Sequence, residues 1–140
     1  MPSDNFTDSV IYIEASDING DAVSGMAPLG IVMLQSKGCG HCTAAKPEYQ
    51  KLADRLQNVQ GVQAYTVQAD TDSQAMKAMS QMIPGFRGFP TYALFRDGRY
   101  LATYDGPRTA DAIMTFIEQG GETRSQVNLP PKSRRVRFQE

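Results

Sequence analysis

Apolar residues occur along this chain in short continuous runs and in segments of helical periodicity. The first run, 10–13, is β-branched and aromatic and predicts a short strand. Residues 29–34 form a continuous apolar run between turn-forming residues, which predicts a strand buried on both faces of a sheet. The turn-rich stretch 15–28 between these two runs has a weaker pattern that could hold one short helix.

Residues 42–56 repeat apolar side chains at helical spacing. The residues that share one face of this segment are Ala45, Tyr49, Leu52, Ala53 and Leu56. Pro47 lies inside the pattern and removes one backbone hydrogen bond of the helix. We therefore expect a helix with a kink after its first turn.

The pattern then changes to a strand and a second helix. Residues 62–69 alternate apolar and polar positions, which predicts a strand, whereas 70–83 have helical periodicity. This helix carries Met76, Met79 and Met82. Methionines at helical spacing fill cores more often than they line a binding site, so we interpret these three as core residues.

The next part of the chain predicts a hairpin and a last helix. An apolar strand at 92–95 leads through the turn sequence 96–99 into a second strand at 100–104. Thr109 is a suitable N-cap for a helix that stops at the glycine pair 120–121.

The order of predicted elements is β, α, β, α, β, β, α. Alternation followed by a hairpin predicts an α/β fold with a mixed central sheet flanked by helices on both faces, in three layers. The chain has 140 residues and a net charge of −1, which suits one soluble domain and gives no indication of nucleic-acid binding. Its apolar runs are too short to span a bilayer, so we expect no membrane partner.

We expect the folded domain to cover residues 8–120, after an N-terminal extension at 1–7. The C-terminal tail, 121–140, is basic: over 122–140 five basic residues stand against two acidic ones, a local net charge of +3. Such a tail is typically disordered and solvated, and the alternatives are that it binds an acidic partner or serves as a docking peptide.

The sequence Cys39-Gly40-His41-Cys42 contains both cysteines and the only histidine of the chain. A Cys-x-x-Cys pair that follows an apolar run and opens a helix is typical of a thiol–disulfide site. The helix dipole and the free N–H groups of the first turn stabilise an anion, so we expect Cys39 to be largely thiolate. Cys42, one turn further along, is the less exposed partner.

Other interpretations of the pair remain. A structural disulfide would close a loop of four residues and restrict the unfolded chain by only roughly 2 kcal/mol. A zinc site needs four ligands, and two thiols with one imidazole would require a second chain or an outside ligand, so we predict no metal. A pair that has lost its redox activity is the third alternative.

His41 favours one direction of exchange. A positive charge between the two thiols stabilises the Cys39 thiolate, and hence the reduced site relative to the disulfide. A stabilised reduced form makes the oxidised form a better disulfide donor, so the Gly-His pair favours oxidation or isomerisation over reduction.

Three blocks of sequence together resemble the catalytic domains of protein disulfide isomerases, a branch of the thioredoxin superfamily. The blocks are Cys39-Gly40-His41-Cys42 with Pro47-Glu48-Tyr49, Gly88-Phe89-Pro90-Thr91 with Phe95-Arg96-Asp97-Gly98, and the run from Tyr104 to Asp111. The resemblance covers about residues 8 to 120. It implies a thioredoxin fold and a thiol–disulfide oxidoreductase that forms, isomerises or reduces protein disulfides.

The resemblance also implies roles for individual residues. Cys39 is the nucleophile and Cys42 the resolving thiol. The Phe89-Pro90 bond is cis, against a base rate of about 5% for X-Pro bonds, and faces the disulfide where the substrate backbone docks. Arg108 matches an arginine that swings toward the second cysteine and lowers its pKa.

Partners and cofactors follow from the same resemblance. We expect a monomer that acts on protein or peptide thiols and disulfides. It needs no cofactor beyond its own Cys39–Cys42 pair, with glutathione or another thiol system as its electron partner.

Three positions depart from the family pattern. Gly38 stands where the family has a tryptophan that forms an apolar lip for substrate, and Thr43 replaces a lysine. Met33 stands where the family has a buried acid that moves the proton of the second thiol. Met33 and Gly38 favour an alternative function, a binding module that keeps the fold and has little turnover.

The first residues, 1–6, have neither the basic nor the apolar region of a signal peptide. The sequence also has no transmembrane run and no endoplasmic-reticulum retention tail. We therefore expect a cytoplasmic protein, with a virion or a virus-infected cell as the alternative.

Overall fold

The computed structural model describes residues 6–121 and is built around a mixed sheet of seven strands. The strands are β1 (Val10–Tyr12), β2 (Ile18–Asn19), β3 (Ala22–Val23), β4 (Leu29–Gln35), β5 (Val62–Gln68), β6 (Thr91–Arg96) and β7 (Arg99–Tyr104). The helices are η1 (Ala15–Asp17, a 3₁₀ helix), α1 (Gly40–Leu56), α2 (Ser73–Met82) and α3 (Ala110–Glu118). The order across the sheet is β1-β5-β4-β6-β7-β3-β2.

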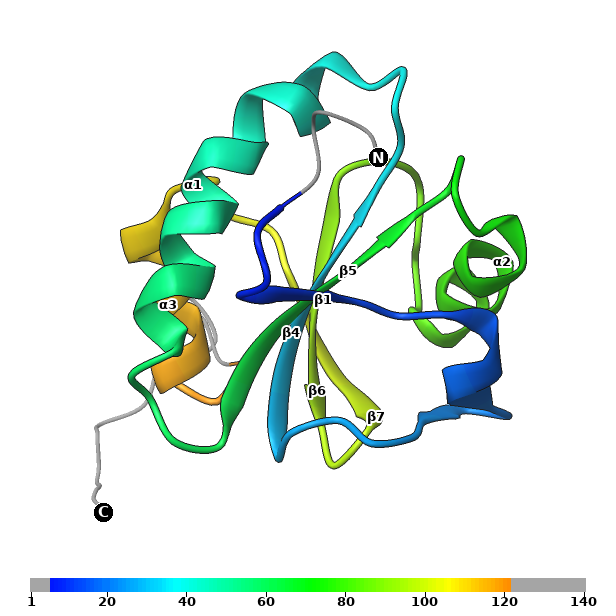
Figure 1. Ribbon diagram of the computed structural model, residues 1–140, viewed down its shortest axis with the longest axis horizontal. Coiled ribbons are helices and arrows are strands. Elements are labelled where there is room, and N and C mark those ends of the chain that lie inside the picture. The colour runs from blue at the N-terminus through cyan, green and yellow to red at the C-terminus, as the bar shows by residue number, and fades with distance from the viewer. Residues whose placement is uncertain (1–5, 122–140) are drawn as a thin grey trace.

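The elements form three layers. β1, β5 and β4 are parallel to one another, and β6 is antiparallel to β4. α1 and α3 lie against one face of the sheet and α2 against the other (Figure 1). The predicted mixed sheet with helices on both faces is therefore confirmed, and it is a thioredoxin fold.

Side chains of β4 alternate between two cores. Ile31 and Met33 belong to the cluster beneath α1 and α3, whereas Val32 and Leu34 belong to the cluster beneath α2. All four are 0% exposed. β4 is also paired along both edges, with β5 and β6. The prediction of a strand buried on both faces is confirmed, and pairing along both edges fixes the position of its end, from which the chain continues to Cys39.

The helix starts follow from capping side chains. The Asp72 carboxylate accepts a hydrogen bond from the N–H of Ala75 at 2.9 Å, so α2 begins later than its periodicity predicted. The Thr109 hydroxyl accepts from the N–H of Ala112 at 3.2 Å, which confirms Thr109 as the N-cap of α3.

The stretch 15–28 differs from the prediction of one short helix. It forms η1 and the strands β2 and β3, which extend the sheet beyond β7. The N–H of Val23 donates to the carbonyl of Gly98 at 2.8 Å, and Gly98 lies in the β6–β7 turn with φ 81°. A side chain at Gly98 would collide with the Val23 carbonyl. Because this contact joins residues far apart in sequence, the local pattern of 15–28 does not contain it.

One side chain ties α1 to the sheet. The helix continues through Pro47, and on its buried face the Tyr49 hydroxyl lies 2.8 Å from the carbonyl oxygen of Ile31 and 2.7 Å from that of Tyr65. These carbonyls belong to β4 and β5. Burial raises the pKa of Tyr49, so its hydroxyl stays protonated and shares its hydrogen between the two acceptors.

The predicted extension and tail lie almost wholly outside the described residues. At the N-terminal boundary, the Phe6 ring packs 5.6 Å from that of Tyr49, and the N–H of Thr7 donates to the Gln50 side chain at 3.0 Å. Within residues 6–121 no helix has the length and apolar character needed to cross a bilayer.

Tyr49→Phe tests the anchor of α1. The variant keeps the ring but removes the hydroxyl from two buried carbonyls, so we expect the free energy of unfolding to fall by about 1–2 kcal/mol. Urea denaturation of the oxidised protein measures this. Tyr100→Phe is the matched control, because its hydroxyl pairs with Thr103 in a half-buried position where water can replace it. An equal loss in both variants would show that the Tyr49 contacts have no special weight.

Candidate active site

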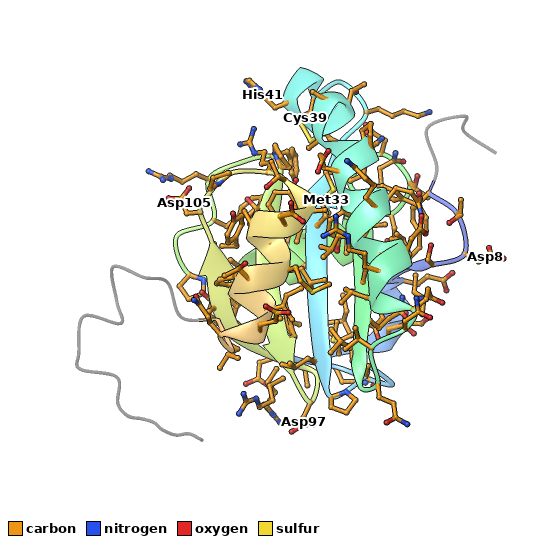
Figure 2. The ribbon with its side chains drawn as sticks, turned by 90° about the vertical axis from the view of Figure 1, so that its left-hand side faces the viewer. Asp8, Met33, Cys39, His41, Asp97 and Asp105 are labelled. Carbon is orange, nitrogen blue, oxygen red and sulfur yellow. A yellow bond between two sulfur atoms is a disulfide. The ribbon has the colours of Figure 1, made fainter. Side chains whose placement is uncertain are left out.

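The turn after β4 places Cys39 at the start of α1. Cys39 is the N-cap, with extended backbone (φ −98°, ψ 108°), and its sulfur accepts a hydrogen bond from the N–H of Cys42 at 3.0 Å. In Figure 2 Cys39 lies at one end of the sheet, and Asp97 of the β6–β7 turn lies at the other. The free N–H groups and the dipole of a 17-residue helix therefore converge on this sulfur.

Cys39 and Cys42 form a disulfide, with their Cα atoms 5.2 Å apart. Cys42 is 0% exposed, whereas Cys39 is only partly buried. An incoming thiol or disulfide can therefore reach Cys39, and Cys42 is enclosed between α1 and the sheet. The two sulfurs differ in access as the helical pattern predicted.

The glycines around the pair leave open space. Gly38 and Gly40 are exposed, and a Cβ built on either one meets no atom within 4 Å. The structure therefore has room at Gly38 for a large side chain, and the approach to Cys39 from this side carries no apolar wall.

His41 lies on the outer side of the first turn of α1. Its side chain is exposed and points away from the body of the protein (Figure 2). It has no hydrogen bond or ion pair within residues 6–121. A positive charge on this imidazole would act on Cys39 through solvent, so its influence is small and is screened by salt.

The Phe89-Pro90 peptide bond is cis, as the resemblance implied. It directly precedes β6, and the Thr91 hydroxyl donates to the carbonyl of Gly88 at 2.5 Å, which holds the turn before the strand. The Phe89 ring packs edge-on against Phe86, with ring centres 5.7 Å apart. Cys39 and Phe89 both pack against the core cluster beneath α1 and α3.

A groove of about 320 Å³ runs beside this cis bond. It lies between the segment 83–91 and the segment 103–108, which comprises the end of β7 and the loop after it. Its charged lining residues are Arg87, Asp105 and Arg108. The structure therefore brings Phe89, Pro90 and Arg108 together. Gly38, Cys39, Gly40 and His41 lie outside this lining, on the α1 side of the site.

Met33 of β4 lies in the buried cluster beneath α1 and α3. It is fully buried in the cluster that contains Cys42, and its cross-strand neighbours are Thr66 of β5 and Tyr92 of β6. Figure 2 shows it inside the protein, on the α1 side of the sheet and below Cys39. Among the described residues no Asp or Glu is buried.

Sequence reasoning missed Tyr92 as a residue of the site. Tyr92 is 2% exposed, and its hydroxyl has no hydrogen-bond partner among the described residues. Burial raises the pKa of Tyr92 to about 12, against an opposing effect of the Arg108 charge. The alternation of 92–95 could have placed this ring in the core, but nothing local indicates which groups it meets there.

The comparisons with known proteins agree with this geometry. The Thioredoxin family model matches residues 16–119. The chain is 36% identical over 110 residues to protein disulfide-isomerase A3 of Gallus gallus, covering 76% of this chain and 20% of that protein. It is 32% identical over 131 residues to a thioredoxin-like protein of Invertebrate iridescent virus 6, covering 80% of this chain and 94% of that protein. The first thioredoxin domain of mouse protein disulfide-isomerase A4 has the same fold, with a TM-score of 0.63 at 19% identity over 97% of this chain and 91% of that domain.

A dithiol pair at a helix N-terminus and a cis-proline before a sheet strand define a thioredoxin-type redox domain. This chain belongs to the thioredoxin family and is a domain like those of protein disulfide isomerases. It spans about a fifth of the length of the chicken isomerase and nearly all of the viral protein. The family and the disulfide-bonded pair support thiol–disulfide oxidoreductase chemistry.

Met33→Glu tests how strongly this core disfavours a charge. Burial would raise the pKa of the introduced carboxyl above its unfolded value of about 4.3, so the folded state binds the extra proton. The variant should then lose stability as pH rises from about 4 through the raised pKa, by roughly 2 kcal/mol or more at pH 7. Unfolding free energies measured across this range test it.

Met33→Gln is the matched control for that series, because it is uncharged at every pH. Its difference from the parent should be constant with pH. If the glutamate variant were equally stable at pH 4 and pH 7, the core beneath Cys42 would have to be solvated well enough to hold an anion.

Proposed function

We propose that this domain is a protein disulfide oxidoreductase of the disulfide isomerase type. It forms, isomerises or reduces disulfides in protein clients through Cys39 and Cys42. The observation that carries the proposal is the unequal access of the two sulfurs at the N-terminus of α1, since exchange needs one sulfur that a client can reach and a second that only the first can reach.

The reaction in the reducing direction has two steps. The Cys39 thiolate attacks a client disulfide, a Cys39–client bond forms, and the other client sulfur leaves as a thiolate. The Cys42 thiolate then attacks the Cys39 sulfur, the Cys39–Cys42 bond forms, and the second client sulfur leaves. Two electrons pass from the domain to the client. The reverse sequence oxidises a client dithiol, and glutathione or another thiol system restores the starting state.

The N-terminus of α1 lowers the barrier to the first step. The Cys42 N–H that donates to the Cys39 sulfur at 3.0 Å also stabilises a thiolate there. The groove is suited to a client backbone, because the cis Phe89-Pro90 bond and the start of β6 line it together with polar and charged side chains. Arg108, on the rim, supplies positive charge near the buried half of the site.

A second candidate is a binding module with little turnover. Two observations favour it: the buried neighbour of Cys42 is the apolar Met33, and Gly38 provides no apolar contact for a client. Such a module would hold clients in the groove without resolving a mixed disulfide. The two candidates differ in whether Cys42 releases the client.

The setting of the protein follows from its relatives and its sequence. The similarity over most of both chains to a viral protein supports a virion or an infected cell, and the sequence-based expectation of a cytoplasmic protein is the alternative. We propose that the domain works as a monomer on protein thiols and disulfides.

Cysteine variants test the assigned roles. Cys39→Ser should abolish disulfide exchange, because the remaining sulfur is enclosed. Cys42→Ser should accumulate mixed disulfides with clients, because nothing is left to release them. Refolding of a reduced client, followed by non-reducing electrophoresis, measures both. Capture of clients by Cys39→Ser and not by Cys42→Ser would reverse the assignment. A parent that binds clients but leaves their disulfides unchanged would support the binding module.

His41→Gln tests the direction of exchange. Removing the imidazole should destabilise the Cys39 thiolate and lower the reduction potential, which makes the variant a poorer disulfide donor. Because His41 is exposed, we expect a shift of roughly 10–20 mV at low salt that shrinks as salt is added. A glutathione titration at two ionic strengths measures it. A potential that stays the same or rises would mean that His41 does not favour oxidation.

A further inference from the structure

Tyr92 is a buried phenol whose hydroxyl is unused. The side chain is 2% exposed, and the hydroxyl oxygen has no hydrogen-bond partner within the described residues. A buried tyrosine hydroxyl ordinarily finds a partner, because it has lost its hydrogen bonds to water. The Tyr92 hydroxyl therefore either lowers the stability of this core or donates a hydrogen bond in a state of the protein other than the oxidised one.

Tyr92 and Cys42 belong to the same buried cluster beneath α1 and α3. On β6 it lies opposite Met33 of β4 and Tyr104 of β7, on the face covered by α1 and α3. Its ring lies 5.8 Å from the ring of Tyr49 on α1 and 6.1 Å from that of Tyr104. Cys42, 0% exposed, belongs to the same enclosed cluster.

The other phenols of this cluster are already engaged. Tyr49 bonds to the carbonyls of Ile31 and Tyr65, and the Tyr104 hydroxyl donates to the carbonyl of Pro107 at 2.5 Å. Of the three phenols in this cluster, Tyr92 is thus the one whose hydroxyl has no acceptor among the described residues.

The charged groups around this cluster are of both signs: the Glu48 carboxylate accepts a hydrogen bond from the N–H of Ala110 at 2.8 Å, and Asp105 lines the groove with Arg108. Arg108, in the loop between β7 and α3, acts electrostatically on Tyr92. Lys46 is 8% exposed and lies one helical turn beyond Cys42, and the exposed His41 lies on the first turn of α1. On the sheet side, Met33 contributes no charge. An anion formed at Cys42 would meet no buried carboxylate among the described residues.

We propose that Tyr92 donates its free hydrogen bond to the Cys42 thiolate when the Cys39–Cys42 bond is open. In the oxidised structure the Tyr92 hydroxyl makes no hydrogen bond to the Cys42 sulfur, which is a weak acceptor as part of a disulfide. Reduction turns that sulfur into an anion, a strong acceptor toward which the buried phenol can turn. This inference rests on the proposed function, since it concerns the sulfur that releases the client.

The proton balance of the step is simple. The Cys42 thiol loses its proton to solvent, and its thiolate attacks the Cys39 sulfur. The Cys39–Cys42 bond forms as the client sulfur leaves with the electron pair of the bond that breaks. Tyr92 keeps its proton throughout, because burial holds its pKa at about 12. Its contribution is to lower the pKa of the Cys42 thiol by bonding to the charged form.

Tyr92→Phe in a Cys39→Ser background measures that pKa without any turnover. We expect the midpoint of the Cys42 thiolate absorbance to rise by about one pH unit when the hydroxyl is removed, since a hydrogen bond to an anion has about this strength. Tyr104→Phe in the same background is the control and should leave the midpoint unchanged. An equal midpoint with Tyr92 and with Phe overturns the proposal, and so does an equal shift in the Tyr104 control.

Stopped-flow mixing of the reduced, full-length protein with an aromatic disulfide that releases a coloured thiolate tests the kinetic effect. The first phase reports attack by Cys39 and the second reports closure by Cys42. A rise of about one unit in the Cys42 pKa leaves about tenfold less thiolate at low pH, but the more basic thiolate is also more nucleophilic. In Tyr92→Phe the second phase should therefore be about threefold slower at low pH and no slower at high pH. The first phase should be unchanged.

The outcomes separate this inference from the proposed function. If the parent shows no first phase, the oxidoreductase proposal fails, while the absorbance titration still decides the role of Tyr92. If Lys46→Met moves the pH midpoint of the second-phase rate and Tyr92→Phe does not, the lysine stabilises the thiolate and the Tyr92 proposal is wrong.

The oxidised Tyr92→Phe variant should melt no lower than the parent, because it loses an unpaired hydroxyl. A clearly lower melting temperature would show that the hydroxyl already has a partner and would overturn the inference.

Discussion

The junction between β4 and α1 is the constraint on which the rest of this structure depends. β4 is paired on both edges and buried on both faces, so its end is fixed in space. α1 begins a few residues later and is held against β4 and β5 by the Tyr49 hydroxyl. Cys39 lies between these two rigid elements. The helix can therefore present its N-terminal N–H groups to one sulfur while its buried face encloses the other.

The site that results is unusual in being built from neutral groups. Beneath α1, the Gln35 side chain donates to the Thr66 hydroxyl at 2.9 Å, and that hydroxyl donates to the carbonyl of Met33 at 2.8 Å. With Met33 and Tyr92 these residues form the floor of the redox site. A floor without a carboxylate avoids the cost of burying a charge, but it provides no internal base for the second thiol. Arg108 acts electrostatically on Tyr92 of this neutral floor, and the N-terminal end of the α1 dipole lies at Cys39.

The client side of the site has a different character. The groove beside the cis-proline has arginines on its rim, and the opposite approach past Gly38 is open. Recognition would then rest on backbone contacts and charge more than on an apolar wall. Such recognition would fit the proposed action on clients of varied sequence, because neither kind of contact requires a particular apolar side chain.

The amino-acid sequence by itself determined the order of the main elements, the three layers, the cap at Thr109 and the paired cysteines, and its resemblance to the isomerase domains implied the cis bond before Pro90. These depend on local periodicity, on local capping chemistry, or on motifs that are contiguous in the chain. Only the tertiary structure decided that 15–28 adds strands to the sheet, that His41 faces solvent, and that the buried Tyr92 hydroxyl, near Arg108, has no partner within residues 6–121. Each of these depends on contacts between residues far apart in sequence, such as Val23 with Gly98, and the pattern along a single segment carries no information about them.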